Sequence, residues 1–597
     1  MKKFIIYSIL CLSITACNYT QNNPKITSRE VKEFITFLAS DSLKGRFTGT
    51  KEAESAANFI MRDFKKSGLK PLFKKSYFQE FPFISSISYS GKNYCEIDLN
   101  KAKLTPILNT GYAAAPFSGN AEVNGNLVFA GYGISAPDLK YDDYKDIDVK
   151  GKIVIIMRYH PDLDSPHSNF EKYSPYRYKA RIAKEKGAAG VIFVNGFSPK
   201  DDEDKLMPLT YDGAAGMENF PVVQVKRNYI NSILIEEGID FTTYQKNIDS
   251  TKTPASFELK FSKVKISTSL DFNKAKGINV AGWIEGSDPK LKNEFIVIGA
   301  HYDHLGFGET GSLYRGKEKL IHHGADDNAS GTAGVMELAE QFATNKKLLK
   351  RSVIFICFAG EELGLLGSEY FVKNSPIETE KMISMLNLDM VGRLNDENSL
   401  IVYGTGTSSV WKKLLNEENK KYNFKLSFND EGYGPSDQTS FYGKQIPVLF
   451  FFTGTHTDYH RPSDVATKIN FTGEVKILDF VSDLALSIIG NKNKPDYINV
   501  PVKDSGRART FKVYLGTIPD FSYQGSGYKI NGVNDGSPAQ KGGIKAGDVM
   551  VSFGGKNIAN IYDYTYALGE FKPGDIVDVI VKRDGKEIKL KVELGAK

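Results

Sequence analysis

Imidazole and carboxylate side chains follow directly after short apolar runs at several places in this sequence. Four of these runs are predicted β-strands, at residues 295–300, 352–358, 382–388 and 446–452. The polar residues that follow them are His301, Asp303, Glu361, Glu362, Asp389 and His460. A fifth segment, Gly324–Gly331, carries Asp326 and Asp327 in front of an amphipathic helix predicted over 332–342. Nitrogen and oxygen donors without a thiolate are typical of catalytic zinc, and they also suit cobalt or manganese.

From Asn279 to about residue 491, predicted strands alternate with predicted helices, which is the pattern of an α/β domain. Ligands of an open parallel sheet bind at the carboxyl ends of its strands, so these side chains are expected to converge. Two metal ions about 3.5–4 Å apart need a bridging carboxylate, further ligands and a free carboxylate as base. Glu361 and Glu362 suit the roles of ligand and base, because adjacent side chains on an extended backbone point apart.

In this order, the motifs resemble those of the M28 family of dizinc peptidases, which have an aminopeptidase fold. The matching segments are His301–Asp303, Gly324–Gly331, Gly360–Ser368, Asn387–Arg393 and Tyr459–Asp464. The resemblance covers about residues 25–110 and 256–490. It implies an α/β fold with a mixed sheet flanked by helices, two zinc ions per chain, and peptides as substrates.

The resemblance also implies which residues hold the metal ions. His301 and Asp389 would hold one zinc ion, and Glu362 and His460 would hold the other. Asp326 would bridge the two ions.

Further roles follow from the same resemblance. Glu361 is expected to be the general base, and Asp303 the carboxylate that orients His301. Asp327 is expected to be the partner of a strained cis peptide beside the bridging aspartate. Tyr459 matches a phenol that helps to polarise the scissile carbonyl. In the implied mechanism, the metals activate a shared water, and Glu361 takes its proton and returns it to the leaving amine.

Other polar residues near these motifs are expected to have structural roles. His304, His322 and His323 are predicted to pack or to hydrogen-bond within loops rather than to bind metal. For His456 and Asp458, the prediction is a structural or substrate-side role, and for Arg393 a structural ion pair. Asp437 has two open interpretations, support of the metal site or a turn cap.

Two accessory domains are expected around the catalytic part. Residues 111–255 resemble a protease-associated (PA) domain that is inserted into the peptidase, where it would cover the substrate cleft or serve as a packing module. Residues 505–595 resemble a bacterial PDZ domain, with Tyr514–Thr517 as its carboxylate-binding loop. A PDZ groove binds a peptide or protein terminus as an added strand.

The N-terminus has the layout of an export signal. Lysines near Met1 precede an apolar run over 4–16 that is too short to span a membrane. Ile14–Cys17 resembles a bacterial lipoprotein box, so residues 1–17 are predicted to be a signal peptide that ends at an acylated Cys17. The expected location is the bacterial cell envelope, with a lipid anchor in a membrane, most simply the outer membrane, on its periplasmic or surface face.

Composition excludes several classes of protein. Hydrophobic residues at 41% and charged residues at 25% are ordinary for a globular protein and exclude disorder as the main state. A net charge of +6 over 597 residues gives no case for nucleic acid as a partner. Four cysteines are too few for a disulfide scaffold, and Cys95 and Cys357 are expected to be unpaired.

The leading hypothesis is therefore a zinc-dependent aminopeptidase that acts outside the cytoplasm. A carboxypeptidase or dipeptidase of the same fold is an alternative, because zinc motifs do not fix which end of a peptide is bound. A glutaminyl-cyclase-like transferase uses one zinc ion, and the presence of His301 argues against it. A peptide-binding protein on an inactive peptidase scaffold is a third alternative, although no ligand or base is lost here.

Overall fold

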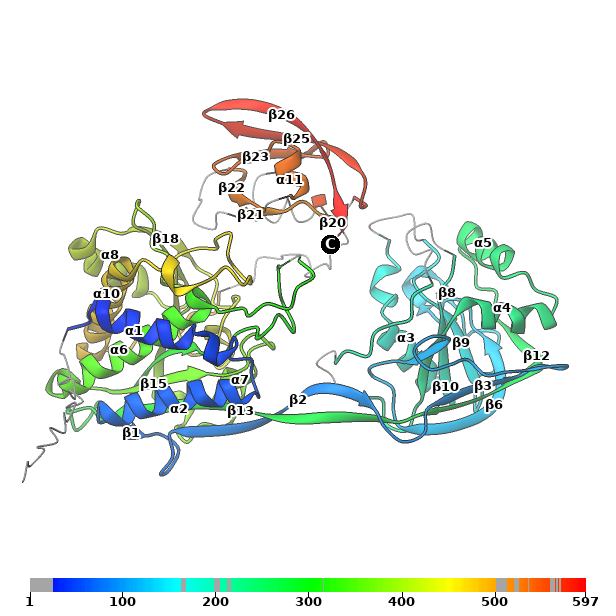
Figure 1. Ribbon diagram of the computed structural model, residues 1–597, viewed down its shortest axis with the longest axis horizontal. Coiled ribbons are helices and arrows are strands. Elements are labelled where there is room, and N and C mark those ends of the chain that lie inside the picture. The colour runs from blue at the N-terminus through cyan, green and yellow to red at the C-terminus, as the bar shows by residue number, and fades with distance from the viewer. Residues whose placement is uncertain are drawn as a thin grey trace, which may run out of the picture.

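The computed structural model describes residues 25–162, 168–197, 204–211, 216–314, 316–500, 513–519, 526–534, 536–558, 564, 567–568 and 571–596. The predicted signal peptide and Cys17 lie outside these ranges. Figure 1 shows three bodies: one rich in helices and built from both ends of the first 500 residues, one from the segment inserted between them, and a small C-terminal one. No helix in the described ranges is long and apolar enough to cross a membrane.

The first body is built on a mixed nine-stranded sheet of order β1-β13-β15-β14-β16-β19-β17-β18, with β2 paired to β13. Strands β15, β14, β16 and β19 are parallel to one another. Strand β13 runs antiparallel to β15, and β17 runs antiparallel to β19. The strands are β1 Lys70–Pro71, β2 Phe78–Tyr89, β13 Leu270–Ile284, β14 Phe295–His301, β15 Ser352–Phe358, β16 Met382–Leu388, β17 Ser399–Tyr403, β18 Lys425–Asn429 and β19 Val448–Phe452. The predicted mixed α/β sheet is confirmed.

Helices cover both faces of this sheet because its central strands are apolar on both sides. Ile296 and Phe355 point into a core formed with α1, α2, α6, α8 and α10, whereas Val297 and Ile356 point to α7 and α9 on the other face. The helices are α1 Ser28–Leu38, α2 Lys51–Lys66, α6 Gly331–Thr344, α7 Leu366–Asn374, α8 Trp411–Tyr422, α9 Gln438–Tyr442 and α10 Phe471–Gly490.

The Thr27 side chain caps the start of α1. The Thr27 hydroxyl accepts a hydrogen bond from the Glu30 backbone N–H at 3.3 Å and donates one to the Glu30 carboxylate at 2.6 Å. Helix α2 starts at Lys51 because the Thr50 side chain caps it. Together, α1 and α2 lay the N-terminal segment against α6 and the sheet.

The inserted body has an eight-stranded sheet of order β4-β3-β12-β6-β9-β10-β11-β5. Its core lies between this sheet and helices α3–α5. Its elements are β3 Tyr94–Asp98, β4 Lys103–Leu104, β5 Tyr112–Ala114, β6 Ala121–Phe129, β7 Ser135–Ala136, β8 Tyr141–Asp142, β9 Ile153–Met157, α3 Tyr176–Glu185, β10 Gly190–Val194, β11 Val222–Val225, α4 Arg227–Glu236, α5 Phe241–Thr251 and β12 Phe257–Thr268. Cys95 lies in this core and Cys357 in the sheet of the first body, and both are free thiols as predicted.

A long antiparallel ribbon joins these two bodies. Strand β2 pairs with β13 from Phe78 and Val280 at one end to Tyr89 and Leu270 at the other. The ribbon runs from the first sheet to the inserted body in Figure 1. The chain therefore leaves and re-enters the first body at one edge of its sheet.

The C-terminal body is a small β-structure with its own apolar core. Its main sheet has the order β21-β22-β23-β25-β26, with β24 paired to β23, and a separate pair joins β20 to β27. The elements are β20 Val513–Tyr514, β21 Thr517–Pro519, β22 Tyr528–Val533, α11 Pro538–Lys541, β23 Val549–Phe553, β24 Lys556–Asn557, β25 Ile576–Arg583, β26 Lys586–Glu593 and β27 Gly595–Ala596.

Candidate metal centre

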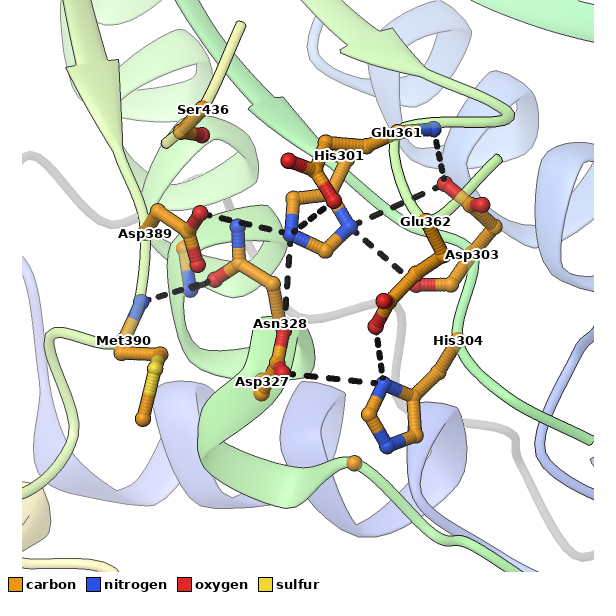
Figure 2. Close-up of polar contacts among 12 residues, drawn as sticks. His301, Asp303, His304, Asp327, Asn328, Glu361, Glu362, Asp389, Met390 and Ser436 are labelled. Carbon is orange, nitrogen blue, oxygen red and sulfur yellow. Dashed lines mark hydrogen bonds and ion pairs between the residues drawn. The ribbon is translucent and has the colours of Figure 1, made fainter. Parts of the chain in front are cut away.

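The carboxyl ends of the parallel strands bring the predicted metal ligands together. His301 is the last residue of β14 and Asp389 directly follows β16. The His301 Nε2 lies 3.4 Å from Asp389 Oδ2 and 3.5 Å from Asp327 Oδ1. These three buried side chains form one group of potential ligands, and Figure 2 shows them converging from three segments of the chain.

A second group of potential ligands lies beside the first. The His460 Nε2 is 3.2 Å from Asp327 Oδ2 and 3.3 Å from Glu362 Oε2. Asp327 therefore uses one carboxylate oxygen toward each group. Although burial opposes its ionisation, the surrounding imidazoles of His304, His460 and His301 hold the pKa of Asp327 well below its usual range.

The structure corrects one predicted ligand: Asp327, not Asp326, lies between the two groups. The Oδ1 of Asp326 accepts hydrogen bonds from the Gly392 N–H at 2.7 Å and the Ser330 hydroxyl at 3.1 Å. Its Oδ2 lies 3.1 Å from His456 Nε2. The physical reason is that neighbouring side chains in this non-helical turn point in different directions. The peptide bond between Asp327 and Asn328 is cis.

His304 lies closer to the centre than its predicted role in packing or a loop implies. Its Nδ1 is 2.8 Å from Glu362 Oε1 and 3.9 Å from Asp327 Oδ2, so it belongs to the second group of potential ligands. Burial lowers the pKa of His304 to about 3, which makes the ring neutral. This contact leaves Glu362 Oε2 on the side of His460.

Glu361, the predicted base, borders the first group. Its Oε2 is 3.9 Å from His301 Nε2, and its side chain is 12% exposed. Burial is the main cause that raises the pKa of Glu361 well above its usual range. The nearby imidazole of His301 lowers this pKa, whereas the carboxylates of Glu362 and Asp389 raise it further.

Asp303 connects His301 to the backbone of the predicted base. Its Oδ1 lies 3.7 Å from His301 Nδ1 and accepts a hydrogen bond from the Glu361 N–H at 3.3 Å. Its Oδ2 accepts a hydrogen bond from the Thr48 hydroxyl at 2.8 Å. The His301 Nδ1 also lies 3.2 Å from the Asp303 backbone carbonyl oxygen, so Asp303 orients the imidazole through its main chain as well as its carboxylate. Sequence reasoning missed Thr48, which lies 255 residues away and in no recognised motif.

A glycine-rich loop orients His460 in the same way. The His460 Nδ1 donates a hydrogen bond to the Gly311 carbonyl at 2.8 Å, and this bond turns Nε2 toward Asp327. Leu313 N–H donates to the His460 carbonyl at 2.9 Å, and Ser312 lies 2.7 Å from His322. Gly311 could not be found from sequence, because a backbone carbonyl has no residue-type signature.

Tyr459 contacts the metal centre through the ring of the next residue, His460. Its ring stacks on His460 with centroids 3.9 Å apart and packs on an apolar group of Met390, Ile401, Tyr403, Phe450 and Phe452. Burial raises its pKa well above the usual range, and the carboxylates of Asp327 and Glu362 add to that effect. The phenol therefore stays protonated and can donate a hydrogen bond.

The remaining predicted residues surround the site. Arg393 Nη2 lies 3.3 Å from Asp458 and 3.1 Å from Asp464, which is the expected structural ion pair. His323 lies 2.8 Å from Asp41 in a loop contact. Asp437 is fully buried, makes no capping hydrogen bond to α9, and has a pKa raised to about 7 by burial. The turn-cap interpretation of Asp437 therefore lacks the bond that it needs.

The donor set fits a divalent metal that prefers nitrogen and oxygen. Within the described residues, Asp327 Oδ2 and Asp389 Oδ1 are buried without a hydrogen-bond partner. Buried carboxylate oxygens are costly unless they are paired or bind a cation. Three imidazoles and three carboxylates around these atoms, with no thiolate, match the chemistry of catalytic zinc.

One carboxylate shared by two groups of donors, beside a buried glutamate, defines a metal-dependent hydrolase. Residues 279–485 match the Peptidase family M28 model, residues 122–233 the PA domain and residues 498–594 the PDZ domain. The catalytic part of the chain is thus an M28 metallopeptidase domain, and the expected PA and PDZ domains are confirmed.

Curated relatives match at moderate identity. "Aminopeptidase YwaD" of Bacillus subtilis is 27% identical over 385 residues, which cover 62% of this chain and 70% of the relative. "Leucine aminopeptidase 2" of Trichophyton rubrum is 28% identical over 250 residues, which cover 36% of this chain. This chain spans 46% of the length of that relative. A solved structure, "Aminopeptidase from Aneurinibacillus sp. strain AM-1", is 23% identical with a TM-score of 0.47 over 80% of this chain and 97% of that one.

Proposed function

We propose that this protein is an aminopeptidase that uses two zinc ions to remove residues from the N-terminus of peptides. His301 and Asp389 would hold one ion, Glu362 and His460 the other, and Asp327 would bridge them. The observation that carries the proposal is the division of the two Asp327 oxygens between His301 at 3.5 Å and His460 at 3.2 Å. The relatives named aminopeptidases support the choice of activity.

The protein side chains have distinct tasks around the bound metal. When bound by these residues, zinc would supply Lewis acidity to a water molecule and to the substrate carbonyl. Glu361 takes the proton from the water and delivers it to the leaving amine, while the Tyr459 phenol donates a hydrogen bond to the developing oxyanion. Asp303 holds His301 in place and fixes the Glu361 backbone through its Oδ1.

Charge favours a substrate with a free amino terminus. Glu361 and Asp389 lie on either side of His301 Nε2, at 3.9 and 3.4 Å. Carboxylates at the edge of the site can hold an ammonium group, whereas an N-acetylated peptide offers no charge there. This argument separates an aminopeptidase from a carboxypeptidase, which needs a cation for the substrate carboxylate.

The test uses the chain from Asn18 onward, loaded with zinc, and a peptide with its N-acetylated twin. Mass spectrometry should show stepwise trimming of the free peptide alone, and a chelator should abolish it. Glu361→Gln serves as the matched inactive variant. Cleavage of both peptides would favour the carboxypeptidase or dipeptidase alternative, and cleavage of neither with zinc bound would favour a binding protein.

We also propose that the PDZ domain captures the carboxyl terminus of substrates. One contact supports this: Arg461, next to His460, donates a hydrogen bond to Asn534 Oδ1 at 2.9 Å. Asn534 in turn donates to the Tyr514 hydroxyl at 2.9 Å and, through its N–H, to the Gly516 carbonyl at 2.8 Å in the predicted carboxylate-binding loop. Peptides with a free C-terminus should then have a lower KM than their C-amidated twins, and equal KM values would contradict the proposal.

Export and lipid attachment at Cys17 remain a proposal based on the N-terminal sequence. Expression of the full chain in a bacterial host should place it in the membrane fraction. Cys17→Ala should release it from the membrane fraction, and membrane association that is unchanged in this variant would contradict the proposal.

A further inference from the structure

A fully buried arginine lies beneath the metal centre, outside every motif that defines the site. Arg46 has no exposed surface and lies between α1 and α2. Its guanidinium donates hydrogen bonds to four backbone carbonyls. These belong to Tyr302 at 2.5 Å from Nε, Leu38 at 3.0 Å and His323 at 2.5 Å from Nη1, and Gly324 at 2.7 Å from Nη2.

Two of the four carbonyls belong to segments that carry metal ligands. Tyr302 lies between His301 and Asp303, at the end of β14. Gly324 precedes the turn that carries Asp327. One rigid, planar group thus fixes the backbone on both sides of the contact between His301 and Asp327, and it ties both segments to the end of α1.

The backbone around Arg46 is shaped for this contact. Lys44, Gly45 and Arg46 all have positive φ angles, of 43°, 70° and 39°. Such angles are costly for residues other than glycine and persist where the surroundings enforce them. A side chain at Gly45 would meet the carbonyl oxygens of His322 and Gly306 at 2.4 and 2.5 Å, so the segment lies directly against the loop that follows β14.

Charge gives Arg46 a second link to the centre. Burial lowers its pKa to about 10, whereas Asp327, Asp303, Asp464 and Glu362 raise it. The guanidinium is therefore a permanent cation under a group of carboxylates. Because its hydrogen bonds go to neutral carbonyl groups, its positive charge is not neutralised by a direct ion pair and still attracts those carboxylates.

We propose that Arg46 is a positioning residue of the metal centre, which sets the spacing of His301 and Asp327 and thereby the affinity for zinc. This inference rests on the proposed function for the identity of the metal. A purely structural role, as a link between N-terminal helices and the sheet, is the competing explanation. The two explanations differ in what a conservative substitution does to metal binding.

The chain contains a matched control for this comparison. Arg351 is also fully buried and donates to the carbonyls of Ile488 at 3.2 Å and Lys492 at 3.2 Å, with Glu294 2.7 Å from its Nε. It precedes β15, at the opposite end of the strand from Glu361. Arg351→Lys should thus cost folding stability of a similar kind without touching the centre.

The experiment compares Arg46→Lys and Arg351→Lys with the unaltered full chain. Zinc affinity is measured by competition with a chromogenic chelator, and the cobalt-loaded proteins are compared by visible absorption. Arg46→Lys should weaken zinc binding about 10–100-fold and alter the cobalt spectrum, as substitutions that disturb ligand orientation do. Arg351→Lys should leave both unchanged, with a comparable loss of melting temperature. Equal zinc affinities in the two variants would overturn the proposal.

Hydrogen exchange on the unaltered chain tests the proposal even if Arg46→Lys does not fold. Zinc should slow exchange at the amides of residues 43–48 as well as 301–304 and 324–328, but not at 349–352. Protection that stops at the ligand segments would overturn the proposal. An unaltered chain that binds zinc but cleaves no peptide would contradict the proposed function and leave this comparison intact.

Discussion

The carboxylate of Asp464 holds the backbone of Asp327, 137 residues away in the sequence. Its Oδ2 accepts hydrogen bonds from the N–H groups of Asp327 at 3.1 Å and Asp326 at 2.9 Å. Its Oδ1 lies 3.1 Å from the Arg393 guanidinium. Asp464 thus joins the loop that carries His460 to the turn that carries the shared carboxylate.

Asp464→Ala should therefore weaken zinc binding without removing a ligand. The loss of the two backbone hydrogen bonds frees Asp327 to move, and supporting groups of this kind change metal affinity about 10–100-fold. Chelator competition measures the effect. Asp458→Ala is the control, because Asp458 also pairs with Arg393. Among the described residues, its carboxylate has no recorded hydrogen bond to the turn that carries Asp327. A similar loss in both variants would show that only the ion pair matters.

Asp327→Asn should reduce zinc binding far more than Asp326→Asn. Asp327 offers one oxygen to each group of ligands, whereas Asp326 is bonded to Gly392, Ser330 and His456. Metal content after dialysis should fall below two ions per chain in Asp327→Asn and remain near two in Asp326→Asn. The reverse order would restore Asp326 as the bridging residue.

Glu361→Gln should separate catalysis from metal binding. An amide cannot take a proton from water, so kcat should fall by about 10²–10⁴-fold, the usual contribution of a general base. Zinc content should change little, because Glu361 is 3.9 Å from His301 and is not required as a ligand. Glu362→Gln provides the contrast and should lose zinc. A Glu361→Gln variant with lost zinc and unchanged kcat per bound metal would assign Glu361 to the metal instead.

The sequence could predict the strand ends because apolar runs and polar residues alternate clearly there. The predicted strand over 352–358 coincides with β15, and that over 382–388 with β16. The choice between Asp326 and Asp327 was wrong because an irregular turn, not a regular periodicity, decides which side chain points inward. Arg46 and Gly311 act through backbone carbonyls, so their contacts leave no pattern of residue types that sequence reasoning could detect.

A buried acid that belongs to neither group of potential ligands predicts how stability depends on pH. Glu337 of α6 is 3% exposed, and within the described residues its Oε1 has no hydrogen-bond partner. Burial raises its pKa to about 9, and the carboxylates of Glu30, Glu340 and Asp63 add to the shift. Between about pH 4.5, where an unfolded glutamate titrates, and pH 9, the folded protein therefore holds a proton that the unfolded chain has lost.

Stability of the peptidase domain should thus fall as pH rises through that window, by up to about 1.4 kcal/mol per pH unit for this one group. Glu337→Gln is neutral at every pH and should remove that contribution, so its melting temperature should exceed that of the unaltered chain at pH 8.5 by more than at pH 5.5. Calorimetry at the two pH values measures the difference. Glu369→Gln, which alters an exposed pair with Lys373, is the control. A difference between Glu337→Gln and the unaltered chain that stays constant with pH would show that Glu337 is ionised in the folded protein.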